Sequence, residues 1–414
     1  MKNSTKVGKN ILWNSVGSLF YYICQWATTV AVVRISGYSA AGMLSLAMAV
    51  TNIFYIFALY GIRNFQISDI NERYCSGIYI STRCFTCFCA QLFCILFCFL
   101  VGYRGTQLLC IITYMIFKLS EALVDVYHGI VQKKWRLDIA GKSYIARGVF
   151  TLLVFCLCLW FTNSLNIAVL GMAISAFAVI LCYDIPMAKR IDESHPQIYL
   201  KQTWLLLQEC LPLLSFQLLI TLLSFIPRYF LEKNFGPEQL GIYSSVANPT
   251  YFVQMLSLLI FTPLIPIFAN TFKKPDKKSF LVLLVKCFLI MLGISAVSLY
   301  GAYLLGQWGL ILLYGKDIIH FTYLLIPVVG CTITTAFVWL FNGVMTAMRA
   351  LGSMVFGAAV ATIICYGLST ILITKYGMNG ISFAQGISQG ILAIYMLAVC
   401  LIKTKDIKQQ NGLK

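Results

Sequence analysis

Long runs of apolar residues, separated by short polar stretches, make up almost the whole chain. A run of about 20 apolar residues is the length that an α-helix needs to cross the hydrocarbon of a bilayer. Because the apolar positions are continuous and do not alternate with polar ones, they exclude a transmembrane β-barrel. The pattern predicts an all-α integral membrane protein with twelve spans, at residues 11–33, 40–62, 84–102, 107–127, 144–162, 166–188, 209–231, 240–270, 280–305, 318–342, 353–374 and 379–402.

The eighth predicted span is too long for a single crossing. Pro249, Pro263 and Pro266 lie within it. Proline kinks or breaks a helix because it lacks an N–H and clashes with the preceding turn. We therefore expect a bend or a break within residues 240–270.

The composition agrees with a membrane protein. Of the 414 residues, 60% are hydrophobic and only 11% are charged, whereas a soluble domain carries about 25% charged residues. Most of the 16 cysteines lie inside apolar runs, and no histidine is near the densest group, Cys84 to Cys98. Such cysteines behave as small buried hydrophobic residues. We expect neither a metal site nor a cofactor.

The formal charge of +17 suggests nucleic-acid binding at first sight, but the distribution of the charges explains it differently. Of the 31 lysine and arginine residues, 23 are assigned to the N-terminus, the C-terminus and every second loop, a count that includes Arg83 and Arg147 at the edges of spans. Five fall on the opposite loops, and three lie deeper within spans. The positive-inside rule then predicts that both termini are cytoplasmic. Contact with anionic membrane lipids is expected, and no nucleic-acid partner is expected.

A short internal repeat indicates two lobes. "GYSAAGMLS", starting at Gly37, and "GPEQLGIYS", starting at Gly236, share two glycines and a serine at equal spacing. Six predicted spans separate the copies, as in transporters built from two parallel repeats with a site at their interface. We expect a first lobe at residues 1–188, a cytoplasmic connector at 189–208, a second lobe at 209–402 and a cytoplasmic tail at 403–414, with the two six-helix lobes pseudo-symmetric.

Three stretches carry a family resemblance. They are "ALYGIRNFQISDI", "SEALVDVYHGIVQKKWRLDIAGKSYIARG" and "PRYFLEKNFGPEQLGIYSSVANPTYF". The chain resembles the polysaccharide or O-antigen flippases of the multidrug/oligosaccharidyl-lipid/polysaccharide (MOP) exporter superfamily. The resemblance implies a transporter rather than an enzyme. It would move undecaprenyl-diphosphate-linked oligosaccharide to the outer leaflet of the bacterial cytoplasmic membrane by alternating access. Polysaccharide polymerase and glycosyltransferases are the expected protein partners.

Polar residues form a stripe on the predicted fourth helix and continue beyond it. Lys118, Glu121, Asp125, His128 and Gln132 are spaced by 3, 4, 3 and 4 residues, which places them on one helix face. Lys118 lies about 15 Å from the expected membrane surface, so it should face protein or water. Two interpretations stay open: a structural Lys118–Glu121 pair, or a relay in the cleft. In the relay, Lys118 contacts substrate and Glu121 or Asp125 takes up protons.

Two further cations are candidates in the second lobe. Arg228 follows Pro227 in the seventh span. It either pairs with Glu232 one turn later or binds phosphate with its planar guanidinium. Lys286 lies in the ninth span, where a structural role is favoured and a role as an additional cleft cation is the alternative.

Other functions fit the residues less well. A multidrug or cation antiporter would favour acidic residues in its cavity, yet the first two predicted spans contain no Asp or Glu. A membrane glycosyltransferase or polymerase usually has a large extramembrane loop and an acidic motif, whereas the loops here are short and contain no Asp-x-Asp. An ATP-binding phosphate loop is excluded, because "AGKS" has Arg136 where the first glycine of that motif is required.

Overall fold

The computed structural model describes residues 2–68, 73–192, 199–250, 253, 268, 271–272, 277–348 and 350–406. These residues form helices and contain no strand. The chain divides into two compact units, Met1–Leu218 (unit 1) and Leu219–Lys414 (unit 2).

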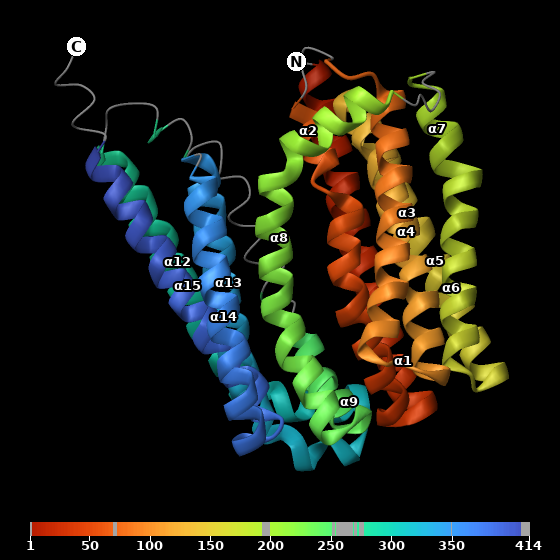
Figure 1. The fold of residues 1–414 in the computed structure, drawn as a ribbon, viewed down its shortest axis with the longest axis vertical. Helices are drawn as coiled ribbons and strands as arrows, with labels where there is room; N and C mark the ends of the chain where they lie inside the picture. The colour runs from red at the N-terminus through yellow and green to blue at the C-terminus, as the bar shows by residue number, and fades with distance from the viewer. Residues whose placement is uncertain are drawn as a thin grey trace. The chain divides into compact units, whose positions relative to one another are not determined.

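Figure 1 shows the helices of both units. Unit 1 contains α1 (Lys2–Leu59), α2 (Ile62–Ser68), α3 (Ser76–Val101), α4 (Gly105–Lys133), α5 (Leu137–Thr162), α6 (Leu165–Val179), a π-helical turn (Ile180–Asp184), α7 (Ile185–Lys189) and the start of α8 (Leu200–Phe235). Unit 2 contains the rest of α8, α9 (Pro237–Ala247), a 3₁₀ turn (Asn248–Thr250), α12 (Lys277–Tyr314), a 3₁₀ helix (Lys316–Leu324), α13 (Leu325–Ala347), α14 (Leu351–Tyr376) and α15 (Asn379–Asp406).

The helices confirm the predicted fold class. Within the described residues, nine helical segments are long and apolar enough to cross a membrane. One of them, in α1, covers the first two predicted spans, and α4, which carries more charges, covers the fourth. Most of the predicted eighth span, 240–270, lies outside the described residues. The chain is therefore a multi-pass α-helical membrane protein.

Two boundaries differ from the expectation. The residues expected to connect the lobes, 189–208, include the beginning of α8 at Leu200, and Leu206 is fully buried in unit 1. The division between the units lies inside α8, later in the chain than residue 209. The short helix α2 follows the second predicted span and has too few residues to show a periodic pattern.

The two copies of the repeat share a backbone conformation. Gly37 interrupts α1 with φ 81° and ψ −178°, and Gly236 precedes α9 with φ 85° and ψ 173°. This region is open almost only to glycine, since a side chain would collide with the backbone. Both glycines therefore end one helix and start the next in the same way, as equivalent positions in a repeat should.

Unit 1 is a bundle in which α1 packs along α5, α4 and α3. At the crossing of α1 and α5 the two backbones touch. A Cβ atom at Gly17 would overlap the carbonyl of Gly141, and one at Gly141 would overlap the carbonyl of Trp13. Small residues at such crossings let helix backbones approach closely, which increases dispersion contacts in a membrane where lipid is as apolar as the side chains.

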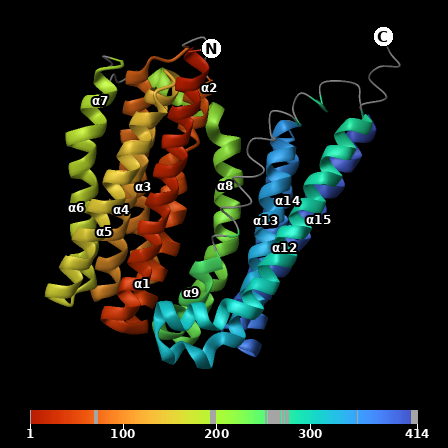
Figure 2. The ribbon, with the colours of Figure 1, turned by 180° about the vertical axis from the view of Figure 1, so that it is seen from behind.

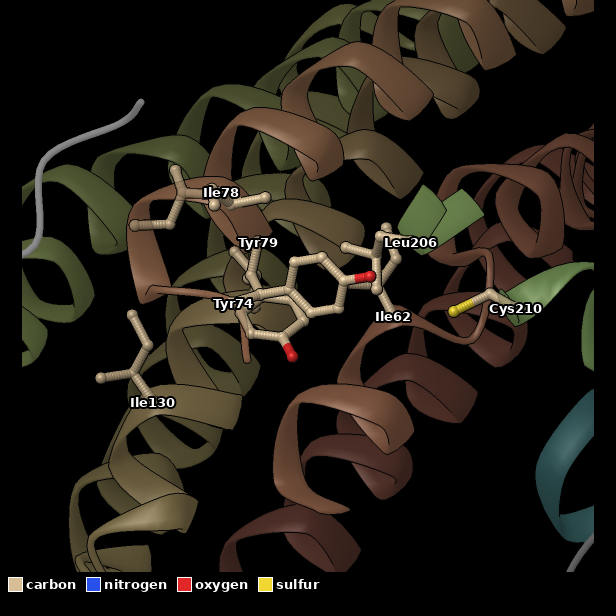
Figure 3. Close-up of a cluster of buried hydrophobic side chains, with 9 residues drawn as sticks. Ile62, Tyr74, Ile78, Tyr79, Ile130, Leu206 and Cys210 are labelled. Atoms are coloured by element: carbon tan, nitrogen blue, oxygen red, sulfur yellow. The ribbon is translucent and has the colours of Figure 1, made fainter. Parts of the chain in front are cut away.

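The N-terminus, α2 and α7 lie at one end of unit 1, as Figures 1 and 2 show. A cluster of buried side chains at this end packs α2 and the start of α8 against α3 and α4 (Figure 3). Its members are Ile62, Tyr74, Ile78, Tyr79, Ile80, Val126, Ile130, Leu206 and Cys210. Because Ile62 is fully buried in this cluster, the next residue, Arg63, has a defined position.

Unit 2 is held together mainly by packing of α15 against α13 and α14. Its buried polar contacts join hydroxyl and amide groups. The Thr335 hydroxyl donates to Gln389 Oε1 at 2.5 Å, and the hydroxyls of Thr250 and Thr332 lie 2.8 Å apart. These uncharged pairs satisfy polar groups inside the unit without the cost of burying a charge.

Candidate functional site

The central polar pair of unit 1 lies on α4. Lys118 Nζ donates to Glu121 Oε2 at 2.5 Å, and the Tyr21 hydroxyl on α1 donates to the other carboxylate oxygen. Lys118 Nζ also lies 5.0 Å from the centre of the Tyr55 ring, within the range of a cation–π interaction. The predicted Lys118–Glu121 pair is confirmed as an ion pair. Both carboxylate oxygens accept hydrogen bonds within unit 1.

Asp125, one turn further along α4, joins two arginines. Arg63 Nη1 donates to Asp125 Oδ1 at 2.9 Å, and Arg83 Nη2 donates to Oδ2 at 2.8 Å. Arg63 Nη2 continues the network to Gln132 Oε1 at 2.8 Å. One carboxylate is therefore shared between two guanidinium groups, which leaves an excess of positive charge at this place.

Arg83 is fully buried near the start of α3. Its Nη1 donates to the carbonyl of Ala58 at 2.7 Å, and the Thr86 hydroxyl donates to the same oxygen at 2.8 Å. Ala58 belongs to the last turn of α1, where carbonyls lack partners within the helix. Arg83 thus caps α1 and holds Asp125 at the same time. We counted Arg83 with the loop charges in the sequence, and that assignment was wrong.

A cavity of about 310 Å³ opens beside these residues. Its lining residues are Leu59, Gly61, Arg63, Ile67, Asp125 and Gln132. Arg63 lies on α2, outside the predicted spans. Burial by itself lowers the pKa of Arg63, but the Asp125 carboxylate outweighs burial and keeps this pKa above its ordinary value. The cavity wall therefore carries the Arg63 guanidinium, the Asp125 carboxylate and the Gln132 amide. Because Asp125 also pairs with the buried Arg83, the net charge of this group is positive, which suits an oxyanion.

His128, the next residue of the α4 stripe after Asp125, forms a buried pair with Asp184. His128 Nε2 is 3.3 Å from Asp184 Oδ1, and each side chain is only 1% exposed. Asp184 ends the π-helical turn, in which the N–H of Ile185 donates to the carbonyl of Ile180. Pro186, which has no N–H to donate, follows directly and accounts for the irregular turn. The His128 ring meets Tyr144 edge to face at 4.8 Å.

Arg147 on α5 is the fourth cation of this region. It is 1% exposed, donates from Nη2 to the Ser120 hydroxyl at 3.2 Å and lies 5.8 Å from the centre of the Tyr21 ring. Its assignment to the loop charges was wrong, because Arg147 lies inside the predicted span 144–162 and well inside α5, which begins at Leu137. Without Arg83 and Arg147 the charge bias keeps its direction.

The other predicted cations lie in unit 2. Arg228 is partly buried on α8 and is close enough to Cys331 on α13 to act on it electrostatically. Lys286 is exposed on α12, among exposed apolar side chains such as Val285 and Leu289. Lys118, Glu121 and Asp125 lie on successive turns of α4 in unit 1, whereas Arg228 and Lys286 lie on different helices of unit 2.

The sequence interpretation missed Arg63, Arg83, Arg147 and the role of Asp184. Their signal was present but ambiguous, because arginines near predicted span ends look like ordinary cytoplasmic charges. Asp184 within an apolar run was the clearest available hint, since an acidic residue inside a span usually has a partner. Within the described residues, no group of three or more His, Cys, Asp or Glu side chains gathers as metal ligands.

Residues 7–272 match the sequence profile of a family described as "Polysaccharide biosynthesis protein". The chain belongs to this family. It is also similar to the capsular polysaccharide biosynthesis protein CapF of Staphylococcus aureus, with 25% identity over 93% of this chain and 97% of CapF.

Solved transporters have the same fold. The lipid II flippase MurJ in an inward closed conformation matches with a TM-score of 0.74 at 13% identity, over 97% of this chain and 91% of MurJ. A mutant of the Vibrio cholerae MATE transporter VcmN matches with a TM-score of 0.66 at 13% identity, over 98% and 97% of the two chains. The predicted MOP-type fold and membership in a polysaccharide biosynthesis family are confirmed. These solved structures are transporters and flippases, not enzymes.

Proposed function

We propose that the protein is a flippase that moves undecaprenyl-diphosphate-linked oligosaccharide from the inner to the outer leaflet of the bacterial cytoplasmic membrane. Membership in the polysaccharide biosynthesis family supports this proposal. So do the names of two similar proteins, one concerned with capsular polysaccharide and the other a lipid II flippase. Polysaccharide polymerase and glycosyltransferases are its proposed partners, and both termini are proposed to be cytoplasmic.

The excess of positive charge at the cavity carries the proposal. Asp125 is shared between Arg63 and Arg83, so the pair of guanidiniums is only half neutralised. A diphosphate is an anion whose oxygens accept planar pairs of N–H bonds from arginine. A transporter of organic cations would need the opposite balance of charge. The geometry therefore favours an anionic head group over a cationic drug.

Transport by alternating access suits the physics of this substrate. Sugar hydroxyls that lose their hydrogen bonds in hydrocarbon cost several kcal/mol, at about 2–7 kcal/mol per group, so they need a polar path while the prenyl chain remains in lipid. Export of a diphosphate moves negative charge outward. The membrane potential assists this movement by about 2.3 kcal/mol per charge per 100 mV.

The proposed roles of individual residues follow from their partners. Arg63 is the proposed phosphate contact in unit 1. Arg228 remains a proposed phosphate contact in unit 2. Lys118 is held by Glu121 and by aromatic rings, which favours the structural interpretation of this pair over direct substrate contact. Lys286, exposed among apolar side chains, is proposed to have a structural or lipid-facing role.

A reconstituted flipping assay tests the function. Vesicles containing the purified protein and a fluorescent undecaprenyl-diphosphate-linked oligosaccharide are probed for substrate in the outer leaflet. Loss of a hydrogen bond to a charged group costs about 1.5–3 kcal/mol, so Arg63→Gln should slow flipping by roughly tenfold to a hundredfold. Arg63→Lys, which keeps the charge but loses the planar fork, should be intermediate.

The matched control is Lys286→Gln, which removes one positive charge from an exposed position. It should flip substrate at the wild-type rate. Protein abundance and thermal unfolding in detergent are measured for each variant, because Arg63 also binds Asp125. Wild-type flipping by a well-folded Arg63→Gln protein would contradict the role of the cavity, and absence of flipping by the wild type would contradict the function.

A further inference from the structure

The two carboxylates first expected to take up protons are fully engaged. Glu121 accepts from Lys118 and Tyr21, and each oxygen of Asp125 accepts from a guanidinium group. Each of these oxygens already accepts a charge-assisted hydrogen bond, which protonation of the carboxylate would weaken. A group with an unpartnered acceptor atom is therefore a better candidate for proton uptake.

His128 and Asp184 have open acceptor atoms. An ionised carboxylate oxygen only accepts hydrogen bonds, so the His128 nitrogen that faces it, Nε2, carries the hydrogen in the neutral ring. The other ring nitrogen, Nδ1, is then an acceptor. Within the described residues, Nδ1 of His128 and Oδ2 of Asp184 are both buried without a hydrogen-bond partner. Burying a polar atom without a hydrogen-bond partner is costly and therefore rare in folded proteins. Two such atoms in one pair therefore call for a functional explanation.

We propose that the His128–Asp184 pair is a proton-binding site linked to occupancy of the Arg63 cavity by an anion. A proton that binds His128 at Nδ1 produces an imidazolium ion, which still donates from Nε2 to Asp184. No other bond forms or breaks. The pair changes from a net charge of −1 to neutral. The inference rests on the proposed function only for the identity of the anion, a prenyl diphosphate.

The link between the two places runs through Tyr144 and Arg63. The His128 ring packs against Tyr144, which interacts with Arg63, and Arg63 lines the cavity. Arg63 and Arg147 are also close enough to act on His128 electrostatically. While the cavity is empty, these two arginines disfavour a further positive charge on His128. An anion that binds Arg63 offsets that repulsion, so anion binding and proton uptake favour each other.

The charged and titratable groups around His128 come from several elements. Asp184 on the π-helical turn, Arg63 on α2 and Arg147 on α5 act on it electrostatically, and Tyr144 on α5 packs against its ring. Beyond Arg63, the Asp125 carboxylate is shared with Arg83. Arg63, Arg147 and Asp184 are thus the groups whose charges decide the protonation of His128.

Nitrogen-15 NMR of histidine observes the site directly. The chain contains three histidines, so a protein with His195→Gln and His320→Gln retains His128 alone. Farnesyl diphosphate, a short prenyl diphosphate, serves as the anion, and farnesol serves as the control without phosphate. Farnesyl diphosphate should move the titration of His128 to higher pH by about one unit, which corresponds to a tenfold coupling. Farnesol should leave it unchanged.

Variants of Asp184, His128 and His320 test the proton site. Asp184→Asn removes the negative partner and should move the titration to lower pH. The affinity for farnesyl diphosphate is measured at pH 6 and at pH 8 in the wild type and in His128→Gln. The decrease from pH 6 to pH 8 should be about fivefold larger in the wild type. Ionisation of the ligand itself is common to both proteins and cancels. His320→Gln, which removes an exposed histidine, should behave as wild type. If farnesyl diphosphate leaves the titration of His128 unchanged, the proposal is overturned.

The flipping assay separates the two proposals. If flipping by the wild type responds to a pH gradient and flipping by His128→Gln does not, both proposals are supported. Flipping that is equally sensitive to the gradient in both proteins overturns the proton site and leaves the flippase function standing. NMR coupling to farnesyl diphosphate in a protein that flips no lipid-linked oligosaccharide supports the proton site and overturns the proposed function.

Discussion

At the scale of single residues, burial decides what a charge can do. Lys118 and Glu121 neutralise each other in contact with aromatic rings and the Tyr21 hydroxyl. Breaking a buried pair costs about 3–5 kcal/mol, although replacing both partners with uncharged residues is often neutral. Each charge has its own partner: the Tyr55 ring faces the Lys118 cation, and the Tyr21 hydroxyl donates to the Glu121 carboxylate.

This asymmetry predicts the outcome of exchanging the two charges. In the double variant Lys118→Glu and Glu121→Lys, the carboxylate would lie over the negative face of Tyr55, and the ammonium group would lie close to Arg147, which acts electrostatically on Glu121. We expect the exchange to lower the free energy of unfolding by about 3 kcal/mol. Lys118→Met with Glu121→Gln should change it by less than about 1 kcal/mol. Chemical unfolding in detergent measures both, and equal stability of the exchanged and wild-type proteins would show that the surroundings do not discriminate.

At the scale of elements, contacts between helix backbones set the architecture of unit 1. The crossing of α1 and α5 leaves no room for a Cβ atom at Gly17 or Gly141. The π-helical turn before α7 is a second local device, because it places Asp184 opposite His128 on α4. Both features join segments that are distant in sequence.

Alanine substitutions at two glycines test the close crossing. Gly141→Ala should lower the free energy of unfolding by about 1–3 kcal/mol, since the added methyl group forces the helices apart. Gly293→Ala, in α12 where a Cβ would meet nothing within 4 Å, should leave stability unchanged or raise it by up to about 1 kcal/mol, because alanine favours helix. Thermal unfolding of the purified variants compares them. A Gly141→Ala protein as stable as Gly293→Ala would refute the tight crossing.

At the scale of the whole molecule, the distribution of lysine and arginine predicts the orientation of the chain in the membrane. Short loops with many basic residues remain in the cytoplasm, because moving cations outward opposes the membrane potential. In unit 1 the N-terminus, α2 and α7 share one end. This arrangement is the one that alternating spans require if the basic loops lie on one side.

Reporter fusions test the orientation. A reporter that is active only in the cytoplasm should be active when fused after Lys414 or inserted after Lys134. The same reporter should be inactive when inserted after Arg104 or Gly315. Activity and protein abundance are measured together for each fusion, and the reversed pattern would contradict the positive-inside assignment.

The amino-acid sequence by itself determined the features that depend on local order. Apolar runs of membrane length give the α-helical fold, because backbone groups in hydrocarbon must be satisfied within the segment. The 3-4 spacing from Lys118 to Gln132 places these side chains on one helix face. The repeated motif singled out Gly37 and Gly236, where the structure has two helix breaks of similar backbone geometry. Each of these inferences involves only residues close together in the chain.

Only the tertiary structure decided which groups contact the polar stripe of α4, from Lys118 to Gln132. Arg63 and Arg83 reach Asp125 from α2 and α3, and Asp184 reaches His128 from the turn after α6. Sequence position does not distinguish a buried arginine near a helix end from a cytoplasmic one, because both follow the same charge bias. Packing of the helices around α4 separates them, since a charge removed from water must find an opposite charge or a hydrogen-bond partner inside the bundle.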